Sequence, residues 1–256
     1  DALRWYFFTI NPPGENKKFS EKGLAGSLRR FILTYWNIFN FWQTYRPKNL
    51  PKKLNKKFLE KLKKPKDVLN LWVVSRWQES KEKTFNLMNK FLIHRAAMEM
   101  ESFLDDFSRW YLRRARKKLQ KQKISDWQVF SYLLGELTKT LAPFIPFLTE
   151  KIWQKLSIDQ EKESVHLTDF PKARKDLLDK KIIEKMAEIR KIAKYVLFLR
   201  QKAGIKIKQP LAWLKIETKK KIEPEFLKLL GEEVNVKRVL LAKISEKEKK
   251  ELLYFD

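Results

Sequence analysis

The sequence predicts a mainly α-helical protein, an antiparallel helical bundle followed by a small α/β appendage. Apolar residues recur every three or four positions through most of the first 200 residues, which is typical of amphipathic helices. Proline and glycine separate these stretches, so short turns would join antiparallel neighbours. Beyond Pro210 the pattern changes to alternation, which indicates strands. We expect the bundle to span residues 21–204 and the appendage 205–256, with residues 1–20 preceding the bundle.

The first two helices are predicted from their stripes and from the breakers that follow them. Residues 1–10 are amphipathic and stop at the Pro-Pro-Gly run of residues 12–14. A longer helix is expected from about Glu21 to Tyr45, with Pro47 just beyond its end. Its apolar stripe is Leu24, Leu28, Phe31, Ile32, Tyr35, Phe39 and Trp42. The lysine-rich segment 48–66 is expected to be a surface excursion.

A second helical zone is expected from Asp67 to about Lys121, with one break. Its later inward stripe is predicted as Phe85, Met88, Leu92, Ala96, Phe103, Phe107 and Trp110. The next helix would begin with a capping box at residues 125–128, Ser-Asp-Trp-Gln. A fourth helix follows Pro146, and a fifth covers about 175–202. Gly204 is suited to end it in a left-handed conformation.

The appendage is predicted as strand, helix, strand. Residues 211–218 alternate, 224–230 begin with proline and are amphipathic, and 234–242 are rich in Val and Leu.

Charge is the strongest compositional signal. Lys and Arg number 57 against 31 Asp and Glu, a formal net charge of +26. Such a field attracts polyanions, nucleic acid first and an anionic membrane surface second. The alternative is that an excess of Lys over Arg simply reflects biased genomic base composition.

Several classes of site are excluded by residue type. No cysteine is present, which excludes disulfides, thiolate nucleophiles and cysteine-bound zinc in this sequence. His94 and His166 fall on different predicted elements and are expected to be structural. Asp105 and Asp106 would face about 100° apart on a helix, a poor acid–base pair. We therefore expect no catalytic and no metal-binding residues. We also expect a piece of a longer chain, because it opens on an aspartate, with no signal peptide and no membrane span.

The stretch 108–118 is the best candidate for a binding site. On a regular helix, Arg109, Arg113 and Arg116 would share one face, with two aromatic rings at its shoulder. Guanidinium groups suit phosphates, and rings suit unpaired bases. The predicted RNA-binding residues here are Trp110, Tyr111, Arg113, Arg114, Arg116, Lys117 and Lys118. The alternative is a solvated helix end whose cations complement the helix dipole, with Trp110 in the core.

Asn37 is a further candidate for RNA binding. It follows Trp36 in the middle of an aromatic helix. Its amide either satisfies a buried partner or points outward to read a base edge.

The order of several motifs resembles one family, the class I aminoacyl-tRNA synthetases of the isoleucine, valine and leucine subgroup. The motifs are residues 1–4 (Asp-Ala-Leu-Arg), 19–23, 33–41 with Trp36 and Asn37, Ser75-Arg76, 103–114, 141–148 and 164–167 (Ser-Val-His-Leu). The run from Trp110 to Arg116, the Ser-Val-His-Leu motif and residues 203–211 are most similar to the isoleucyl-tRNA synthetases. Departures are Arg109, where the family often has Asn, and Phe170, where it often has Trp.

This resemblance implies a helical anticodon-binding domain, preceded over residues 1–20 by the end of a stem-contacting connector. In related enzymes, the positions equivalent to Asn37 and Trp110 lie near the anticodon. The parent reaction would attach isoleucine to its tRNA with ATP and Mg²⁺, in a cytoplasmic and monomeric enzyme. The HIGH and KMSKS motifs of class I are missing and are expected before Asp1, so no cofactor is expected here, and zinc in a further C-terminal region stays open.

Three alternatives remain at this stage. The chain could be the corresponding region of a valyl or leucyl enzyme. It could be a basic helical scaffold for RNA or a membrane surface, or a fragment with an unrecognised catalytic site.

Overall fold

The computed structural model describes residues 1–16, 18–50, 61–156, 163–218 and 221–242. It divides into two compact units, residues 1–179 and 180–256, each considered by itself below. The predicted surface excursion lies largely in residues 51–60, outside the described residues.

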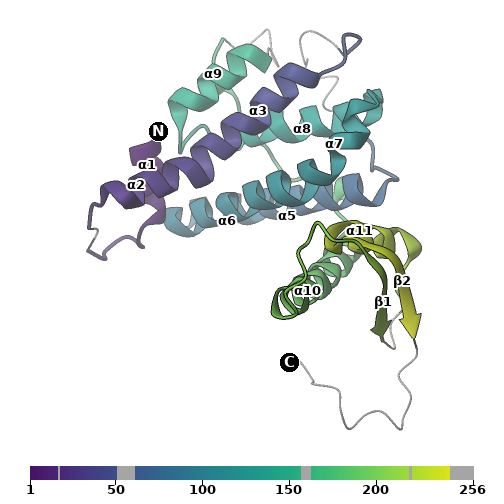
Figure 1. Ribbon diagram of the computed structural model, residues 1–256. Coiled ribbons are helices and arrows are strands. Elements are labelled where there is room, and N and C mark those ends of the chain that lie inside the picture. Colours follow the sequence, from purple (N-terminus) through teal and green to yellow (C-terminus); the bar gives the residue numbers. More distant parts are fainter. Residues whose placement is uncertain (17, 51–60, 157–162, 219–220, 243–256) are drawn as a thin grey trace. The chain divides into compact units, whose positions relative to one another are not determined.

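The first unit is helical throughout its described residues (Figure 1). Its elements in chain order are α1 (Ala2–Thr9), α2 (Glu21–Ser27), the π-helical turn η1 (Leu28–Ile32), α3 (Leu33–Tyr45), α5 (Val68–Asn89), α6 (Ile93–Asp105), the π-helical turn η2 (Asp106–Leu112), α7 (Arg113–Gln120), α8 (Ile124–Leu141), α9 (Pro146–Leu156), and the 3-10 turns η3 (Val165–Leu167) and η4 (Lys175–Leu177).

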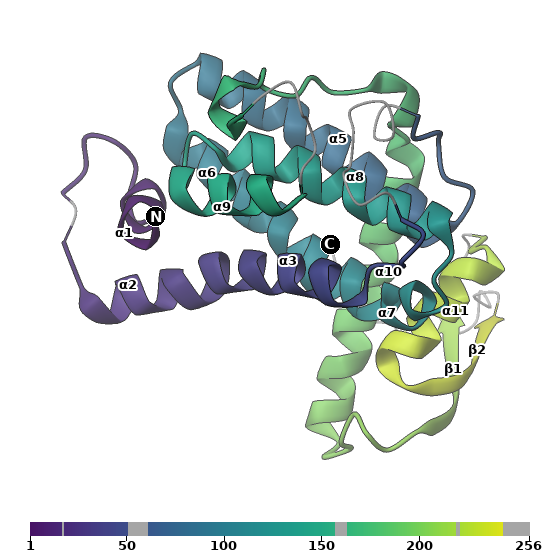
Figure 2. The same cartoon turned by 90° about the horizontal axis from the view of Figure 1, so that it is seen from above.

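Helix α8 is the centre of this unit, in contact with α3, α5, α7 and α9 (Figure 2). Its sequence is apolar on most sides, as expected for a helix surrounded by others. Two polar groups join it to α3: the Trp42 indole donates to Ser131, and Tyr35 bonds Thr138, at 2.9 and 2.7 Å. These buried polar side chains of α3 and α8 therefore each have a hydrogen-bond partner.

Helix α5 forms an antiparallel hairpin with the run α6–η2–α7. Ring contacts pair Trp77 with Phe103 and Trp72 with Trp110. Residue numbers thus fall along α5 as they rise from α6 to η2, so the two segments are antiparallel. The break that sequence predicted in this zone lies at residues 90–92. The helical zone itself is therefore confirmed.

The π-helical turn η2 changes which residues face inward. A π-helix has more than four residues per turn, so it moves the inward position one residue along the chain. The fully buried side chains from α6 to α7 are accordingly spaced by four: Phe103, Phe107, Tyr111, Ala115 and Leu119. The predicted inward stripe is wrong at Trp110, which is only half-buried, and also at Phe85 and Leu92, which are exposed near the break between α5 and α6.

Arg76 of α5 holds η2 in place. Its guanidinium donates to Asp106, the first residue of η2, at 3.0 Å, and to Glu99 of α6 at 2.9 Å. The Arg76 side chain is 13% exposed and both carboxylates are less so. Burial by itself would lower the pKa of Arg76, but Glu99 and Asp106 outweigh it, so its pKa is raised above the ordinary value.

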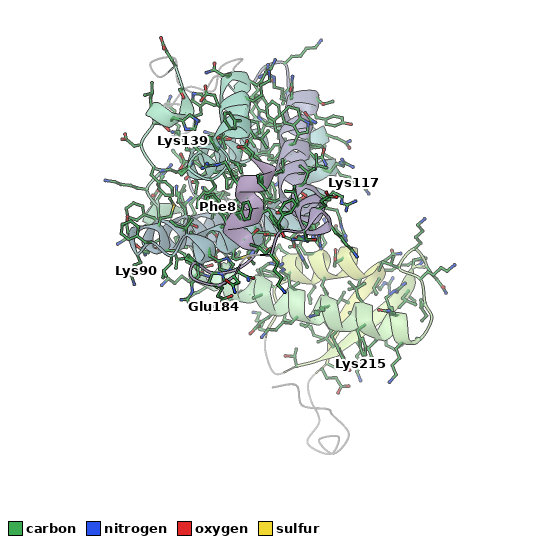
Figure 3. All side chains as sticks on the ribbon, turned by 90° about the vertical axis from the view of Figure 1, so that its left-hand side faces the viewer. Phe8, Lys90, Lys117, Lys139, Glu184 and Lys215 are labelled. Atoms are coloured by element: carbon green, nitrogen blue, oxygen red, sulfur yellow. The ribbon has the colours of Figure 1, made fainter. Side chains whose placement is uncertain are left out.

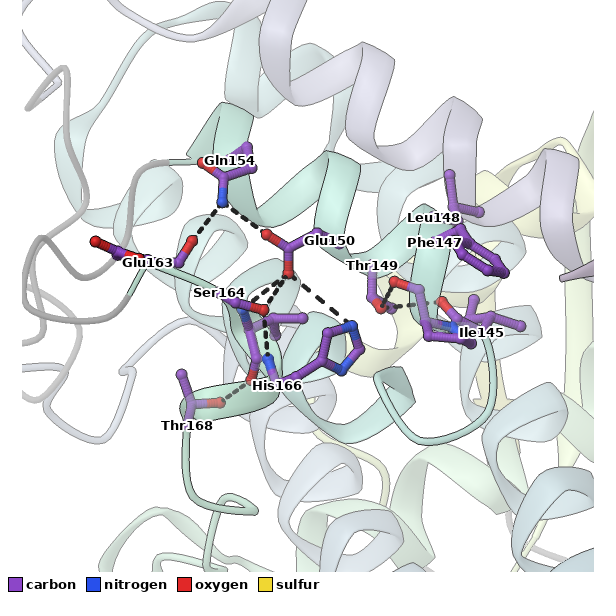
Figure 4. Close-up of polar contacts among 12 residues, drawn as sticks. Ile145, Phe147, Leu148, Thr149, Glu150, Gln154, Glu163, Ser164, His166 and Thr168 are labelled. Carbon is purple, nitrogen blue, oxygen red and sulfur yellow. Dashed lines mark hydrogen bonds and ion pairs between the residues drawn. The ribbon is translucent and has the colours of Figure 1, made fainter.

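Two carboxylates fasten the ends of the unit. The Asp1 carboxylate accepts from the Leu148 amide at 2.6 Å and so caps α9. Glu150 accepts from the Ser164 hydroxyl at 2.7 Å and the Val165 amide at 3.0 Å, which attaches η3 to α9 (Figure 4). Burial alone would raise the pKa of Glu150, yet these bonds and one from Gln154 hold its pKa below the usual range.

The second unit contains α10 (Lys180–Lys202), β1 (Leu211–Glu217), α11 (Pro224–Val234) and β2 (Val236–Ala242). The two strands are parallel, with Trp213 paired to Arg238, and α11 is the crossover between them. Gly231 lets α11 approach β2 closely, because a Cβ there would lie 3.1 Å from the Val236 carbonyl oxygen. Gly204 has a φ of +69°, as predicted.

The predicted fold class is confirmed, with two local differences. Helix α8 begins at Ile124 with Lys123 as its cap and no side-chain capping bond, so the capping box predicted at residues 125–128 is wrong. Ser125 lies inside the first turn instead. The compact units meet at residues 179 and 180, whereas sequence placed the boundary at 204 and 205, because α10 packs on α11.

Replacement of Arg76 by methionine is expected to destabilise the protein by about 3–5 kcal/mol, because Glu99 and Asp106 would stay buried without their partner. Urea unfolding measures this. Arg30→Met is the control, since its pair with Glu101 is exposed and worth at most about 1 kcal/mol. Equal losses in the two variants would contradict the role of Arg76.

Stability is also expected to fall in acid through Glu99. Burial raises the pKa of Glu99, but Lys83, Arg76 and Ser80 outweigh it, so the folded-state pKa lies below that of the unfolded chain. A depressed carboxyl pKa contributes stability above the unfolded value of about 4.3, and that contribution is lost as pH falls through the folded value. As the pH is lowered from 6 to 3, the free energy of unfolding measured with urea should decrease less for Glu99→Gln than for the unaltered chain.

Candidate nucleic-acid interface

Helix α7 is positioned by its neighbours at both ends. The π turn precedes it, and at its C-terminal end the Trp127 indole of α8 donates to the Leu119 carbonyl at 2.9 Å. Gln122 then adopts a left-handed φ of +57°, which ends the helix. Ala115 and Leu119 are buried, so the opposite side of α7 must face outward.

Three predicted cations lie on that outward side. Arg113, Arg116 and Lys117 are exposed, and Lys117 is labelled in Figure 3. Cations at the end of a helix complement its dipole, but their exposure also leaves them accessible to a polyanion.

Trp110 and Arg114 form a stack at the start of this edge. The Arg114 guanidinium carbon lies 3.6 Å from the centre of the Trp110 ring, and Arg114 Nη1 donates to the Trp110 carbonyl oxygen at 2.8 Å. Trp110 is half-buried and its ring meets Trp72 edge-on. One ring face is thus covered by a cation, so the group presented to a ligand is a planar guanidinium backed by an indole.

Tyr111 is a core residue. It is 0% exposed, and its hydroxyl donates to Asn70 Oδ1 at 3.0 Å. Burial raises the pKa of its hydroxyl well above the usual value. The prediction that Tyr111 contacts RNA is therefore corrected: the π turn brings residue 111, in place of residue 110, to the inside.

Lys118 is held by two internal acids. Its ammonium lies 2.9 Å from both Asp67 Oδ1 and Asp126 Oδ1. Asp126 is nearly fully buried and also accepts from Asn70 Nδ2 at 2.7 Å. The charge of Lys118 therefore stabilises the starts of α5 and α8, and its contact with RNA phosphate stays a prediction.

Arg109 is exposed and pairs with Asp105 one turn earlier, at 2.8 Å. It lies four residues before Arg113, the spacing that keeps Phe107 and Tyr111 on one side through the π turn, so it points outward as Arg113 does.

Asn37 lies on the exposed side of α3, close to α7. The Arg116 guanidinium carbon lies 5.4 Å from the centre of the Phe41 ring, one turn after Asn37, so the two helices are neighbours here. Asn37 itself is exposed, which rules out the interpretation that its amide serves a buried partner. We define the α3–α7 edge as the following residues: Asn37, Tyr45, Trp110, Arg113, Arg114, Arg116 and Lys117.

Sequence reasoning did not single out several residues around this edge. Tyr45 is 45% exposed beside Phe41, and the Arg46 guanidinium stacks 4.8 Å from the centre of the Trp42 ring. Lys121 and Lys123 are exposed at the end of α7. A signal that could have found the first two is that an aromatic and a basic residue, Tyr45 and Arg46, are adjacent at the end of α3.

The two histidines have structural contacts. His94 Nδ1 lies 3.0 Å from the Phe8 carbonyl oxygen, and His166 lies 4.0 Å from Glu150 (Figure 4). Within the described ranges, no cluster of three or more His, Asp or Glu residues could hold a metal ion. Among the same residues, no helix is both long and apolar enough to span a bilayer.

Comparison with known families decides what this edge belongs to. The model of the anticodon-binding domain of tRNA ligases matches residues 70–218, which include α5 to α10 and β1. The chain belongs to this family of anticodon-binding domains. The matched range contains the η2 and α7 residues of the α3–α7 edge, whereas Asn37 and Tyr45 precede it.

Several curated relatives of this anticodon-binding domain are isoleucine–tRNA ligases. The isoleucine–tRNA ligase of Clostridium acetobutylicum is 34% identical over 251 residues, 93% of this chain and 23% of the relative. That of Dehalococcoides mccartyi strain CBDB1 is 34% identical over 91% of this chain, and that of Clostridium kluyveri 30% over 94%. The chain spans about a quarter of the length of these relatives.

Tyr111→Phe should separate the core role of residue 111 from RNA binding. The variant loses one buried hydrogen bond to Asn70, so the free energy of unfolding should fall by about 1 kcal/mol. Affinity for RNA should not change, as measured by filter binding on the folded variant. A large loss of affinity with unchanged stability would show that the ring reaches the ligand.

Proposed function

We propose that this chain is the tRNA-recognition region of an isoleucine–tRNA ligase and that its α3–α7 edge contacts the anticodon side of isoleucine tRNA. The observation that carries the proposal is the Arg114–Trp110 stack, flanked by exposed cations on α7 and by Asn37 on α3. The family match and the names of the relatives support it.

Each group on the edge has a chemistry that suits a tRNA loop. Arg113, Arg116 and Lys117 would neutralise backbone phosphates, which adds affinity without sequence preference. The Arg114 guanidinium plane, stiffened by Trp110, would stack on an unpaired base. The Asn37 amide offers a donor and an acceptor to a base edge, which would provide discrimination.

The parent protein would attach isoleucine to its tRNA at the expense of ATP, with Mg²⁺ on the nucleotide. Its catalytic groups would lie outside this chain, which would contribute binding but no cofactor site. We place the parent enzyme in the cytoplasm as a monomer, and zinc in a further C-terminal region as an open part of the proposal.

Removal of cations from the α3–α7 edge should weaken binding to every tRNA. If about six phosphates are contacted, log K should fall with log salt with a slope of about −4 to −5.5, and Arg116→Ala or Lys117→Ala should each make the slope shallower by about 0.7–0.9. Filter binding from 50 to 300 mM salt measures this. Lys90→Ala at the tip of the α5–α6 hairpin removes the same charge and should leave the slope nearly unchanged; an equal effect would contradict a localised contact.

Replacement of Trp110 should reduce discrimination more than affinity. Without the indole, the Arg114 plane loses its backing, so Trp110→Ala should bring the affinities for isoleucine tRNA and an unrelated tRNA closer together. Trp110→Phe keeps an aromatic support and should retain most of the difference. Arg114→Lys keeps the charge without the plane and should behave like Trp110→Ala. Equal affinity of the unaltered chain for both tRNAs would overturn the specific part of the proposal.

A further inference from the structure

The parallel sheet of the second unit has one face covered by α11 and one face open. On the covered face, Val239 lies against α11, where a Cβ on Gly231 would be 3.4 Å from the Val239 side chain. Because side chains alternate along a strand, the residues paired as Trp213 with Arg238 and Lys215 with Leu240 share the other face. We call these four residues the sheet platform.

The sheet platform combines an open aromatic ring with cations. Trp213 is 61% exposed and Leu240 50% exposed. Arg238 is exposed directly opposite Trp213, about 5 Å away at the backbone. Lys215, labelled in Figure 3, lies next along the strand and forms a 2.9 Å ion pair with Glu217. The platform therefore presents an open ring beside cations, a combination that suits a ligand with a planar ring and an anionic group.

A basic loop borders the end of the sheet at which β1 and β2 begin. Residues 203–210 lead directly into β1, and the Asn235 amide just before β2 donates to the Ile207 carbonyl at 2.8 Å. Arg200, only 4% exposed, donates from Nη2 to the Lys206 and Gln209 carbonyls at 2.7 and 2.5 Å. The loop is thus held in one conformation, with Lys206 and Lys208 exposed.

The charge of this unit favours an anionic partner. Lys and Arg clearly outnumber Glu along residues 180–242, and Asp does not occur there. A ring on an open sheet, with cations beside it, is the arrangement that stacks on a base and neutralises its phosphate. A second copy of this chain would bring the same charges together, which repel each other.

We propose that the sheet platform is a second RNA-binding site, on which an unpaired nucleotide stacks against Trp213 while Arg238 and the lysines of the 203–210 loop contact the adjacent phosphates. It lies in the second unit, whereas the α3–α7 edge lies in the first, and it rests on the proposed function only in that the natural ligand would be tRNA. The contact needs no helical partner strand, so single-stranded RNA is sufficient as a probe.

Fluorescence anisotropy with a labelled twelve-nucleotide oligoadenylate tests this on the full chain. Trp213→Ala should weaken binding about tenfold, and Trp213→Phe should retain most of it, because stacking is worth that much per base and is tolerant of ring type. Arg238→Ala should weaken binding and make the salt slope shallower by about 0.7. The matched controls are Leu241→Ala, which removes an apolar side chain of β2 outside the platform, and Lys237→Ala, which removes a cation of the covered face.

Three outcomes would overturn the proposal. One is unchanged oligoadenylate affinity in Trp213→Ala with its fold intact by circular dichroism. Another is an equal loss in Lys237→Ala and Arg238→Ala, which would indicate charge without a site. The third is dimerisation in analytical ultracentrifugation that Trp213→Ala abolishes while RNA affinity stays the same, which would assign the face to a second copy.

Failure of the two proposals can be distinguished. If Trp110→Ala and Arg116→Ala alter tRNA binding but Trp213→Ala does not alter oligoadenylate binding, the α3–α7 edge stands and the platform fails. If the chain binds oligoadenylate through Trp213 but does not prefer isoleucine tRNA, the platform stands and the proposed function fails.

Discussion

The geometry of the first unit depends on one buried cation, the guanidinium of Arg76. It joins α5 to Glu99 of α6 and to Asp106 at the start of the π turn, inside a hairpin otherwise held by aromatic packing. A buried charge is tolerated only when its partners are close and correctly directed, so this interaction specifies one register of the hairpin.

The π turn is the link between this core interaction and the surface. It adds a residue to one helical turn, which directs the Tyr111 hydroxyl to Asn70, itself a donor to Asp126, and moves Trp110 to the edge. The same shift places Arg114 over the Trp110 ring. π turns often occur at functional sites because they reorient side chains without ending a helix.

The cations of the short helix α7 have two kinds of surroundings. Lys118 neutralises Asp67 and Asp126 inside the bundle, whereas Arg113, Arg116 and Lys117 are exposed. The net charge of +26 attracts any polyanion, but only the positions of these side chains relative to Asn37 and Trp110 can provide selectivity. The second unit also combines an aromatic ring with cations, but on a β-sheet instead of a helix.

Sequence alone determined the helical class, the strand–helix–strand order of the appendage and the basic-aromatic stretch, because these depend on local periodicity and composition. That Asn37 and Trp110 lie near the anticodon was implied only by resemblance to a family. The tertiary structure decided that Tyr111 is inside and Trp110 at the edge, since aromatic residues stand at both positions and the pattern alone does not choose between them. It likewise decided that Lys118 is paired, because Asp67 and Asp126 reach it only after α5 and α8 pack against α7.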